Sequence, residues 1–497
     1  MDRFLASPKA YYGFLIFLLL LTLLPVLLYI NTCSIRVWDE GRQAVNATMM
    51  FLNKNYLITY FEGKPDFWNT KPLLLIWLQV LGLKLFGIGE VGLRIPSALA
   101  AMLTVSLLFW FGWQKLQKPL IGILSALVLI STRGYVAQHV ILTGDFDALL
   151  TFFITAYSLF FFLYLETFRK KYWVAVTIAL ILGALTKSVA ALLPLPGLIA
   201  YALLSRKFLP LLKRKEIYLG MLSFVAVMAA YYFSREQVQP GYWQAVQDNE
   251  LGGRFLKTLE EHDRPWYFYL TGDKFMPWLL LIIPAIFVAY KFAEGIIRRF
   301  AFFASLFFFG FLITISVSKT KLLWYAVPLY PMGGLLVAIG FYYTFQWATK
   351  RYQMAHPNRF VLISLVLIFG IFYGIVVGRV ASQPRKDKTD MLAADAYFMK
   401  NFHREFPELK NYTFISQEGY NSSLDFYLLK FRQEGYTIQD KRELHIQKDY
   451  CQLRNLPAGA LILCCNPDLI SRLKAAYELK EVKTQDAWLA ARIVREK

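Results

Sequence analysis

The sequence predicts an all-α polytopic membrane domain followed by a small soluble α/β domain. Hydrophobic residues fill 57% of the 497 positions and charged residues only 18%, whereas soluble domains have roughly 45–50% apolar and about 25% charged residues. Apolar runs long enough to cross a bilayer recur as far as residue 378. The tail, residues 380–497, lacks such runs, and its segments alternate between strand-like and helix-like patterns.

The charge balance is strongly basic, with a net charge of +20. In a soluble protein this would suggest nucleic acid, but no aromatic–basic RNA motif accompanies it. In a membrane protein it fits basic cytoplasmic loops and contact with anionic lipid, so we expect membrane lipids and no nucleic acid as partners. The four cysteines show no zinc spacing, and the adjacent Cys464 and Cys465 cannot form a relaxed disulfide with each other.

About eleven apolar runs are candidate transmembrane helices. They are residues 11–30, 93–113, 120–131, 148–165, 173–190, 191–204, 217–233, 275–290, 301–317, 322–345 and 360–378. The first run has no small-x-small cleavage site, which indicates a retained helix. A further run, 72–86, is ambiguous, because it is about 15 residues long and contains Gln79 and Lys84.

The run 72–86 either crosses the membrane or lies along its surface, and the distribution of Lys and Arg decides between these two topologies. If 72–86 does not cross, nearly every dense basic cluster falls on the same side as the N-terminus, as the positive-inside rule requires. We therefore expect a cytoplasmic N-terminus and a juxtamembrane helix at 72–86. The membrane domain is predicted to span residues 1–379 and a periplasmic α/β domain residues 380–497. In that domain, 413–416 and 460–464 resemble strands, and 389–402 and 470–477 resemble helices.

Two motifs stand in the predicted first outer loop. Asp39 and Glu40 follow the first helix directly, and either cap an interfacial helix or supply a carboxylate base that faces an acceptor. Lys71 precedes Pro72 at the start of the juxtamembrane segment. It either snorkels to the interface or contacts a lipid-linked phosphate.

Further polar residues fall on the same predicted face. Asp145 and Asp147 stand at the mouth of an apolar helix, where carboxylates are costly unless they cap it or face a polar cavity. The others are Lys187, Arg254, His262, Arg264, Lys321 and Tyr325. Cations that neutralise a leaving phosphate and carboxylates that orient a nucleophile are what transfer from a polyprenyl-phosphate sugar requires.

These residues resemble a known superfamily. Asp39-Glu40, Lys71-Pro72-Leu73 with Trp77-Leu78-Gln79, and Leu93-Arg94-Ile95-Pro96-Ser97-Ala98-Leu99 are similar to motifs of the dolichyl-phosphate-mannose–protein mannosyltransferases. The bacterial branch, which contains the lipid A aminoarabinose transferase, is most similar, and the likeness covers roughly residues 10–345. It implies a GT-C fold with about 11 transmembrane helices plus juxtamembrane helices.

The resemblance also implies an inverting glycosyltransferase. It would move a sugar from a polyprenyl (undecaprenyl) phosphate donor to lipid A, another cell-surface glycan or a similar acceptor, on the periplasmic side of a bacterial inner membrane. The resemblance assigns the acids Asp39 and Asp147, the donor-phosphate cations Lys71, Lys187, Arg264 and Lys321, and His262. Glu40 joins Asp39 as a catalytic candidate, and Asp145, Arg254 and Tyr325 join His262 as substrate-binding candidates. We expect a monomer.

One departure bears on cofactors. In the aminoarabinose transferases an acidic residue precedes the Lys-Pro and is associated with a metal, and Thr70 stands in that place here. We therefore expect no metal or other cofactor. Two alternatives stay open: a protein O-mannosyltransferase, and a lipid or solute transporter. The sequence shows neither an inverted repeat nor a pair of Gly/Pro-broken helices, which are features expected of a transporter.

Overall fold

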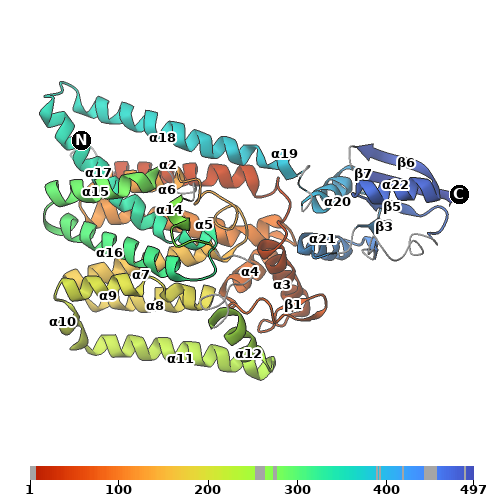
Figure 1. Cartoon of the computed structure of the whole chain (residues 1–497), viewed down its shortest axis with the longest axis horizontal. Helices are drawn as coiled ribbons and strands as arrows, with labels where there is room; N and C mark the ends of the chain where they lie inside the picture. Colours follow the sequence, from red (N-terminus) through yellow and green to blue (C-terminus); the bar gives the residue numbers. More distant parts are fainter. Residues whose placement is uncertain are drawn as a thin grey trace.

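The computed structural model describes residues 7–251, 264–271, 277–387, 390, 393–416, 419–441, 456–485 and 488–497. Figure 1 shows a bundle of long helices lying side by side, with a small sheet-containing domain at one end. We call this end of the bundle the C-domain end. The N-terminal helix and the last long helix, α18, lie on the same side of the bundle.

Among the described residues, seven helical segments are long and apolar enough to cross a membrane. They are formed by α2 (Pro8–Tyr29), α5 (Glu90–Trp110) with η1 (Phe111–Lys115), α7 (Phe146–Thr167), α8 (Lys170–Lys187) with η2 (Ser188–Leu192), α11 (Lys215–Val238), α16 (Gly295–Val317), and α18 (Pro357–Ala381) with α19 (Gln383–Asp387). Shorter apolar helices are α4 (Leu74–Phe86), α6 (Pro119–Ile130), α9 (Leu195–Leu204) and α15 (Trp278–Phe292). The 23-residue α17 (Leu329–Arg351) packs against α6 and α15.

Each of the eleven predicted runs therefore corresponds to a helix, with two shifted boundaries. The run 322–345 begins with the short 3₁₀ turn η4 (Leu323–Ala326), and α17 starts only after Pro328. The pair 173–190 and 191–204 is separated by η2, where Ser188 adopts a positive φ of 48°. Both boundaries lie at the C-domain end, where the chain leaves regular helix near the polar residues discussed below.

Close helix contacts depend on glycine. A Cβ on Gly82 of α4 would collide with the backbone of Gly92 in α5, and one on Gly197 of α9 would lie 2.5 Å from the Leu306 carbonyl of α16. Small residues of this kind let helix backbones approach closely in membrane proteins. The ambiguous run 72–86 corresponds to helix α4. This helix packs along α5 and against α3 (Asp39–Asn53).

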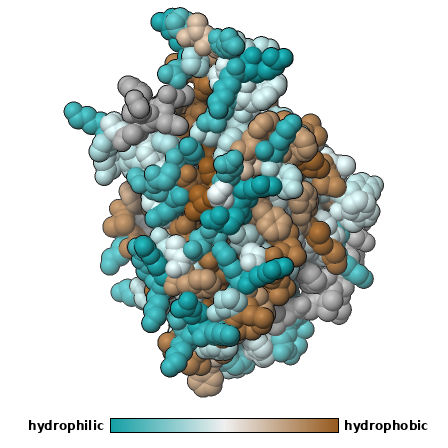
Figure 2. Space-filling model, turned by 90° about the vertical axis from the view of Figure 1, so that its left-hand side faces the viewer, coloured by the Kyte–Doolittle hydropathy of each residue, from teal (hydrophilic) through white to brown (hydrophobic). Residues whose placement is uncertain are grey.

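The elements between the long helices are short. They comprise β1 (Tyr60–Phe61), β2 (Lys64–Pro65), α10 (Phe208–Leu212), α12 (Tyr242–Val246), η3 (Gln247–Leu251) and α14 (Phe268–Thr271). Figure 2 shows the end of the bundle opposite the C-terminal domain, where many hydrophilic side chains lie over apolar helix surface. The placement of this end in the cytoplasm, expected from the positive-inside rule, stays a prediction.

The described part of the tail forms a five-stranded sheet in the order β4-β3-β5-β7-β6. Its elements are α20 (Ala394–Glu405), β3 (Asn411–Ile415), α21 (Ser422–Gln433), β4 (Thr437–Lys441), β5 (Leu461–Cys464), α22 (Pro467–Ala476), β6 (Tyr477–Gln485) and β7 (Trp488–Glu496). β4, β3 and β5 run parallel, and β7 and β6 complete the sheet antiparallel. The four segments predicted in the tail are confirmed in type. The boundary at residue 379/380 stays a prediction, since α18 continues to Ala381.

The tail domain docks on the first loop through α21. Ser423 Oγ donates to the Ile35 carbonyl at 2.5 Å, and the buried Tyr427 hydroxyl accepts from Ile35 N at 3.2 Å and donates to Glu90 at 2.7 Å. Gly41 of α3 lies directly beneath α21. A Cβ there would meet Ser422 Oγ and would lie 2.8 Å from the backbone nitrogen of Ser423.

We expect Gly41→Ala to loosen this docking. The added methyl group meets backbone atoms that cannot move independently, and overpacking of this kind typically costs about 1–3 kcal/mol. The measurement is thermal unfolding in detergent together with limited proteolysis of the tail. Gly13→Ala is the matched control, because Gly13 lies in α2 with nothing within 4 Å of its Cβ position. Equal melting temperatures for the two variants would contradict the tight contact.

Candidate functional site

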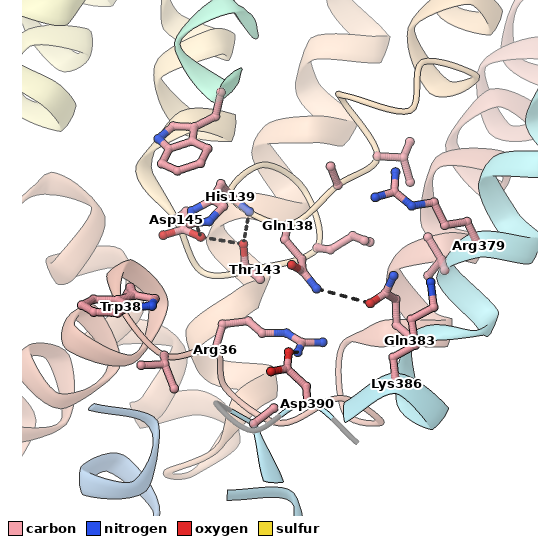
Figure 3. Close-up of a pocket in the computed structure, with 17 residues that line it drawn as sticks. Arg36, Trp38, Gln138, His139, Thr143, Asp145, Arg379, Gln383, Lys386 and Asp390 are labelled. Atoms are coloured by element: carbon pink, nitrogen blue, oxygen red, sulfur yellow. Dashed lines mark hydrogen bonds and ion pairs between the residues drawn. The ribbon is translucent and has the colours of Figure 1, made fainter. Parts of the chain in front are cut away.

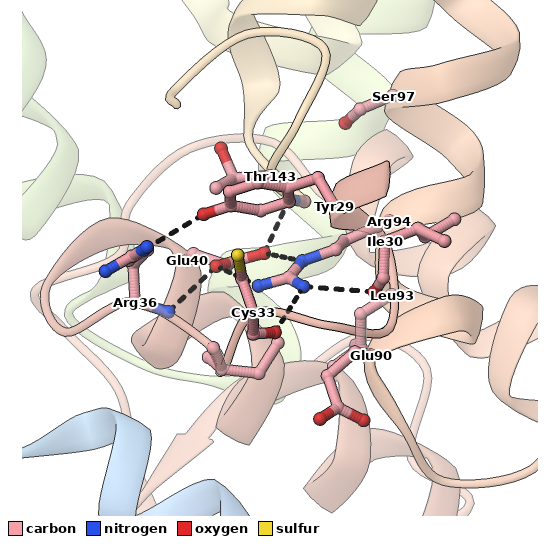
Figure 4. Close-up of polar contacts among 12 residues, drawn as sticks. Tyr29, Ile30, Cys33, Arg36, Glu40, Glu90, Leu93, Arg94, Ser97 and Thr143 are labelled. Atoms are coloured by element: carbon pink, nitrogen blue, oxygen red, sulfur yellow. Dashed lines mark hydrogen bonds and ion pairs between the residues drawn. The ribbon is translucent and has the colours of Figure 1, made fainter. Parts of the chain in front are cut away.

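The core of the C-domain end is a buried ion pair between Arg94 of α5 and Glu40 of α3 (Figure 4). Arg94 Nε lies 2.6 Å from Glu40 Oε1, and Nη2 lies 3.0 Å from Oε2. The remaining guanidinium donors bind the carbonyls of Ile30, Cys33 and Ser34 at 2.8–3.0 Å. Buried charges are tolerated when they are paired and hydrogen-bonded, as this pair is.

Glu40 also accepts two backbone hydrogen bonds. Arg36 N–H donates to Oε2 at 2.8 Å, and Gly144 N–H donates to Oε1 at 3.0 Å. The carboxylate thus joins the first loop to the segment that precedes α7. With 1% of its side chain exposed and both oxygens engaged, Glu40 has the surroundings of a structural anchor, not of a base that meets substrate.

Asp39 faces the other way from its neighbour. It is the first residue of α3, and 48% of its side chain is exposed. The preceding Trp38 adopts a positive φ of 76°, and its ring stacks on Tyr420 of the tail domain with centroids 5.1 Å apart. Its carbonyl accepts from Ser422 Oγ at 3.4 Å. The strained turn into α3 is therefore supported by the docked tail domain.

Asp39 and Asp145 both face the ring of His139. His139 Nδ1 lies 3.8 Å from Asp39 Oδ2 and 3.6 Å from Asp145 Oδ2. The imidazole stacks on Trp324, with centroids 4.0 Å apart and planes at 12°. His139 was not identified from the sequence. Its position within eight residues of two paired acids, in a segment predicted on the same face, could have singled it out.

Asp145 is almost fully buried where the chain enters α7. It accepts from Thr143 Oγ1 at 2.6 Å and from Gln43 Nε2 at 3.2 Å. Burial raises the pKa of Asp145 to about 7; His139 opposes this shift, and the carboxylates of Asp39 and Glu40 add to it.

A cavity of about 460 Å³ opens beside these residues (Figure 3). Asp145, His139 and Thr143 line one side of it, and Arg36, Arg379 and Lys386 line another. Gln138 bridges to Gln383 of α19 at 3.4 Å across its wall. The cavity joins the first loop, the segment before α7 and the end of α18, and is large enough for a sugar-sized or phosphate-bearing group.

A second buried ion pair joins α7 to α8. Lys187 Nζ lies 2.6 and 2.8 Å from the two oxygens of Asp147, and the two side chains are 8% and 6% exposed. The ammonium also lies 5.3 Å from the centre of the Tyr325 ring. Its charge interacts with Asp39 as well. Charged groups buried within membrane helices are functional candidates because burying them is expensive.

The other predicted cations are distributed more widely. Lys71 lies 5.6 Å from the Phe146 ring and 3.8 Å from Glu250, and Thr70 Oγ1 contacts the same carboxylate at 3.3 Å. Lys321 donates to the Ser318 carbonyl at 2.6 Å, and Arg264 is exposed. The predicted substrate residues Arg254 and His262 lie outside the described residues.

The predicted residues thus form two neighbouring groups, Asp39 with Asp145 around His139, and Asp147 with Lys187 and Tyr325. In the first group, Asp39, His139 and Asp145 could hold a metal ion, since each offers a ligand atom within 4.8 Å of the others. The expectation that the protein binds no metal rested on Thr70, which is not one of these three residues. That expectation stays untested.

Comparisons with known proteins show which families the chain is similar to. Residues 70–233 match the family described as dolichyl-phosphate-mannose-protein mannosyltransferase. The undecaprenyl phosphate-alpha-4-amino-4-deoxy-L-arabinose arabinosyl transferase of Aeromonas hydrophila is 26% identical over 310 residues, which cover 60% of this chain and 55% of that protein. The chain thus spans about half the length of the named arabinosyl transferases it matches. An uncharacterised protein of Aquifex aeolicus is 28% identical over 435 residues, covering 84% of this chain and 90% of the relative.

A solved structure extends the likeness to nearly the whole chain. The crystal structure of ArnT from Cupriavidus metallidurans bound to undecaprenyl phosphate superposes with a TM-score of 0.71 at 16% identity, and covers 98% of both chains. The fold, including the tail domain, is therefore shared. The chain is a multi-pass membrane protein with the GT-C fold, and it is similar in part of its length to the dolichyl-phosphate-mannose–protein mannosyltransferases and the aminoarabinose transferases.

Proposed function

We propose that this protein is an inverting glycosyltransferase that moves a sugar from a polyprenyl phosphate, such as undecaprenyl phosphate, to lipid A or another cell-surface glycan. The observation that carries the proposal is the buried Asp147–Lys187 pair beside the exposed carboxylate of Asp39. The names of the matched relatives, which act on an undecaprenyl-phosphate sugar, support the donor class.

The donor phosphate would bind on the Lys187 side. Lys187 is already desolvated and held by Asp147, so a phosphate oxygen that approaches it meets a preorganised cation. Lys71, Lys321 and the exposed Arg264 are the further cations we assign to the donor. The leaving phosphate gains charge as the glycosidic bond breaks, so contacts with these cations strengthen in the transition state. Tyr325, whose ring lies next to the Lys187 ammonium, would contact the sugar.

The acceptor would enter through the cavity lined by His139 and Asp145. Asp39 stands beside it with half of its side chain exposed, where it can accept a proton from an acceptor hydroxyl or orient an acceptor phosphate. Glu40 holds the turn that aims Asp39 and does not itself meet substrate in this assignment. We assign the site and the tail domain to the periplasmic side of a bacterial inner membrane.

We expect Asp39→Asn to abolish transfer in folded protein. The amide keeps the shape of the side chain but loses the charge and the ability to take a proton, a loss typically worth about 10²–10⁴ in rate. The measurement is mass spectrometry of lipid A, surface glycans and secreted proteins in a deletion strain that expresses each variant. Glu62→Gln, an exposed acid of the same loop, is the control. Wild-type product levels with Asp39→Asn would leave Asp39 as a helix-starting residue only.

We expect Asp147→Asn and Lys187→Ala to lower kcat and to weaken donor binding. Each change also leaves a buried charge without its partner, which can cost about 3–5 kcal/mol of stability. The control is therefore Glu166→Gln, which removes a similar ion-paired carboxylate at the opposite end of the same helix, where Lys207 and Arg299 bind it at 2.6 and 2.7 Å. Transfer kinetics on variants matched for melting temperature separate the two effects. Equal kinetics for Lys187→Ala and Glu166→Gln would exclude Lys187 from the donor site.

The orientation in the membrane is tested by labelling single cysteines in a background without native cysteines. We expect Lys410→Cys, exposed in the tail domain, to react with an impermeant maleimide added to intact spheroplasts. Lys170→Cys, exposed at the start of α8, should react only after the membrane is opened. The reverse pattern would place the tail and the site in the cytoplasm.

A further inference from the structure

A second cavity, of about 640 Å³, lies between the tail domain and the ends of two membrane helices. Asn31 and Thr32, which follow α2, line it together with Pro384 of α19, and α20 and α21 supply most of the remaining wall. Figure 1 shows α20 beside α19, where the bundle meets the tail domain. Because α2 and the segment formed by α18 and α19 are long enough to cross a membrane, the cavity lies where a bilayer surface would meet the tail domain. Its lining residues differ from those of the cavity beside His139.

Three cations of the tail domain line this second cavity. Lys400 of α20 joins the domain to the bundle, since its ammonium lies 2.6 Å from Glu90 Oε1 and donates to the Asn31 carbonyl at 2.8 Å. Lys430 of α21 is held more loosely, 3.8 Å from the other oxygen of Glu90. Arg404 of α20 is exposed, and its side chain makes no hydrogen bond or ion pair with the described part of the chain. The docking of the tail domain therefore accounts for Lys400 but leaves the Arg404 guanidinium available to a ligand.

The charged groups that line the cavity, or that contact its lining side chains, are positive on balance. Glu434 lines the cavity as well, and Glu90 lies behind the two lysines. At the rim, Lys410 and Glu408 both act on the ring of Tyr436 and offset each other. The three lining cations and Lys410 thus stand against three carboxylates, which leaves one positive charge. The phosphodiester of an anionic lipid would neutralise this charge.

Aromatic rings complete the wall. His403 stacks on Tyr436 with centroids 4.2 Å apart and lies 3.8 Å from the Phe431 ring, and all three line the cavity with Tyr397. Burial lowers the pKa of His403 to about 3, with a further contribution from the charge of Lys430, so the imidazole is neutral. Its buried Nδ1 makes no hydrogen bond within the residues that the structure describes. A polar atom of this kind is expected beside a ligand or an ordered water.

We propose that this cavity binds the phosphate-bearing headgroup of a membrane lipid. Arg404 would hold the phosphate through two parallel donors, and Lys430 would act on it as a point charge. The aromatic wall would contact the glycerol or sugar next to the phosphate, and the acyl chains would stay in the bilayer beside α2 and α19. Basic pockets beside transmembrane helices are sites of this type for anionic lipid headgroups. An anionic phospholipid and a phosphorylated glycolipid share this chemistry, and the test below separates them.

The test is lipid binding by the delipidated full-length protein in detergent, measured by native mass spectrometry and by thermal unfolding. The probes are phosphatidylglycerol, lipid A, phosphatidylcholine and inorganic phosphate. A ligand that binds only the folded state raises the unfolding temperature. We expect phosphatidylglycerol or lipid A to bind and to raise it, and phosphatidylcholine and inorganic phosphate to have little effect. The larger shift identifies the source: phosphatidylglycerol indicates a phospholipid, and lipid A indicates a glycolipid.

Variants connect this binding to the cavity. We expect Arg404→Gln to weaken binding of the preferred lipid by at least about tenfold, because it removes charge-assisted hydrogen bonds to the phosphate. Arg404 is exposed and unpaired within the described residues, so this change should leave the fold intact, and Arg404→Lys should restore binding in part. Lys474→Gln is the matched control, since it removes an exposed cation of α22 that does not line the cavity.

Three results would overturn the proposal. They are equal stabilisation by phosphatidylcholine and the anionic lipids, an equal effect of inorganic phosphate alone, and unchanged lipid binding by Arg404→Gln relative to Lys474→Gln. No sugar transfer enters these measurements, and none of the residues assigned to donor or acceptor is changed. The outcome is therefore independent of the proposed glycosyltransferase activity.

Discussion

The buried contact between Arg94 and Glu40 organises the whole C-domain end of the bundle. One guanidinium binds the carboxylate and three carbonyls at the end of α2, and the same carboxylate accepts the backbone N–H of Gly144 before α7. Three segments that are distant in sequence, residues 30–40, Arg94 and Gly144, therefore share one electrostatic junction. Removing either partner would leave a buried charge uncompensated, the most damaging change that such a pair permits.

This junction also explains how two adjacent acids acquire different roles. Glu40 points inward to Arg94, and its neighbour Asp39, one position along the helix, points toward the cavity. The turn that precedes both acids has Trp38 at positive φ, and the tail domain supports that turn through Tyr420 and Ser422. The soluble domain is thus part of the framework that positions Asp39, although the sequence presents it as a separate unit.

The sequence allowed the long helices to be predicted, because bilayer thickness sets a minimum length for an apolar run and the runs stand out from their surroundings. It also singled out Asp39, Asp147 and Lys187, since charges at the ends of apolar helices are conspicuous. It could not assign Glu40 to Arg94, because that pairing joins residues 54 positions apart and depends on how α3 packs on α5. His139 was missed although it stands six residues before Asp145 in the sequence, because a lone histidine gives little signal, and its contacts with Asp39 and Asp145 appear only in the structure. In the tail, β6 and β7 were not predicted, since the charges of β6 stand at Glu478, Lys480, Glu481 and Lys483 without strict alternation, so that the segment resembles an exposed helix as much as a strand.

The two groups of polar residues divide the chemistry of the proposed reaction. Lys187 and Asp147 form a buried pair that is neutral as a whole. The ammonium therefore loses its water when the protein folds, and not when the donor binds. An arriving phosphate then completes a triad around a cation that already has its position. The group around His139 has a different character, because its carboxylates stand at one side of an open cavity whose other side is lined by Arg36, Arg379 and Lys386. In the proposed reaction, a carboxylate of this group would attract the proton of an acceptor hydroxyl, and the cations across the cavity would meet negative charge on the acceptor. We therefore assign the donor phosphate to the α8 side and the acceptor to the α3 side, which gives the sugar one direction in which to move.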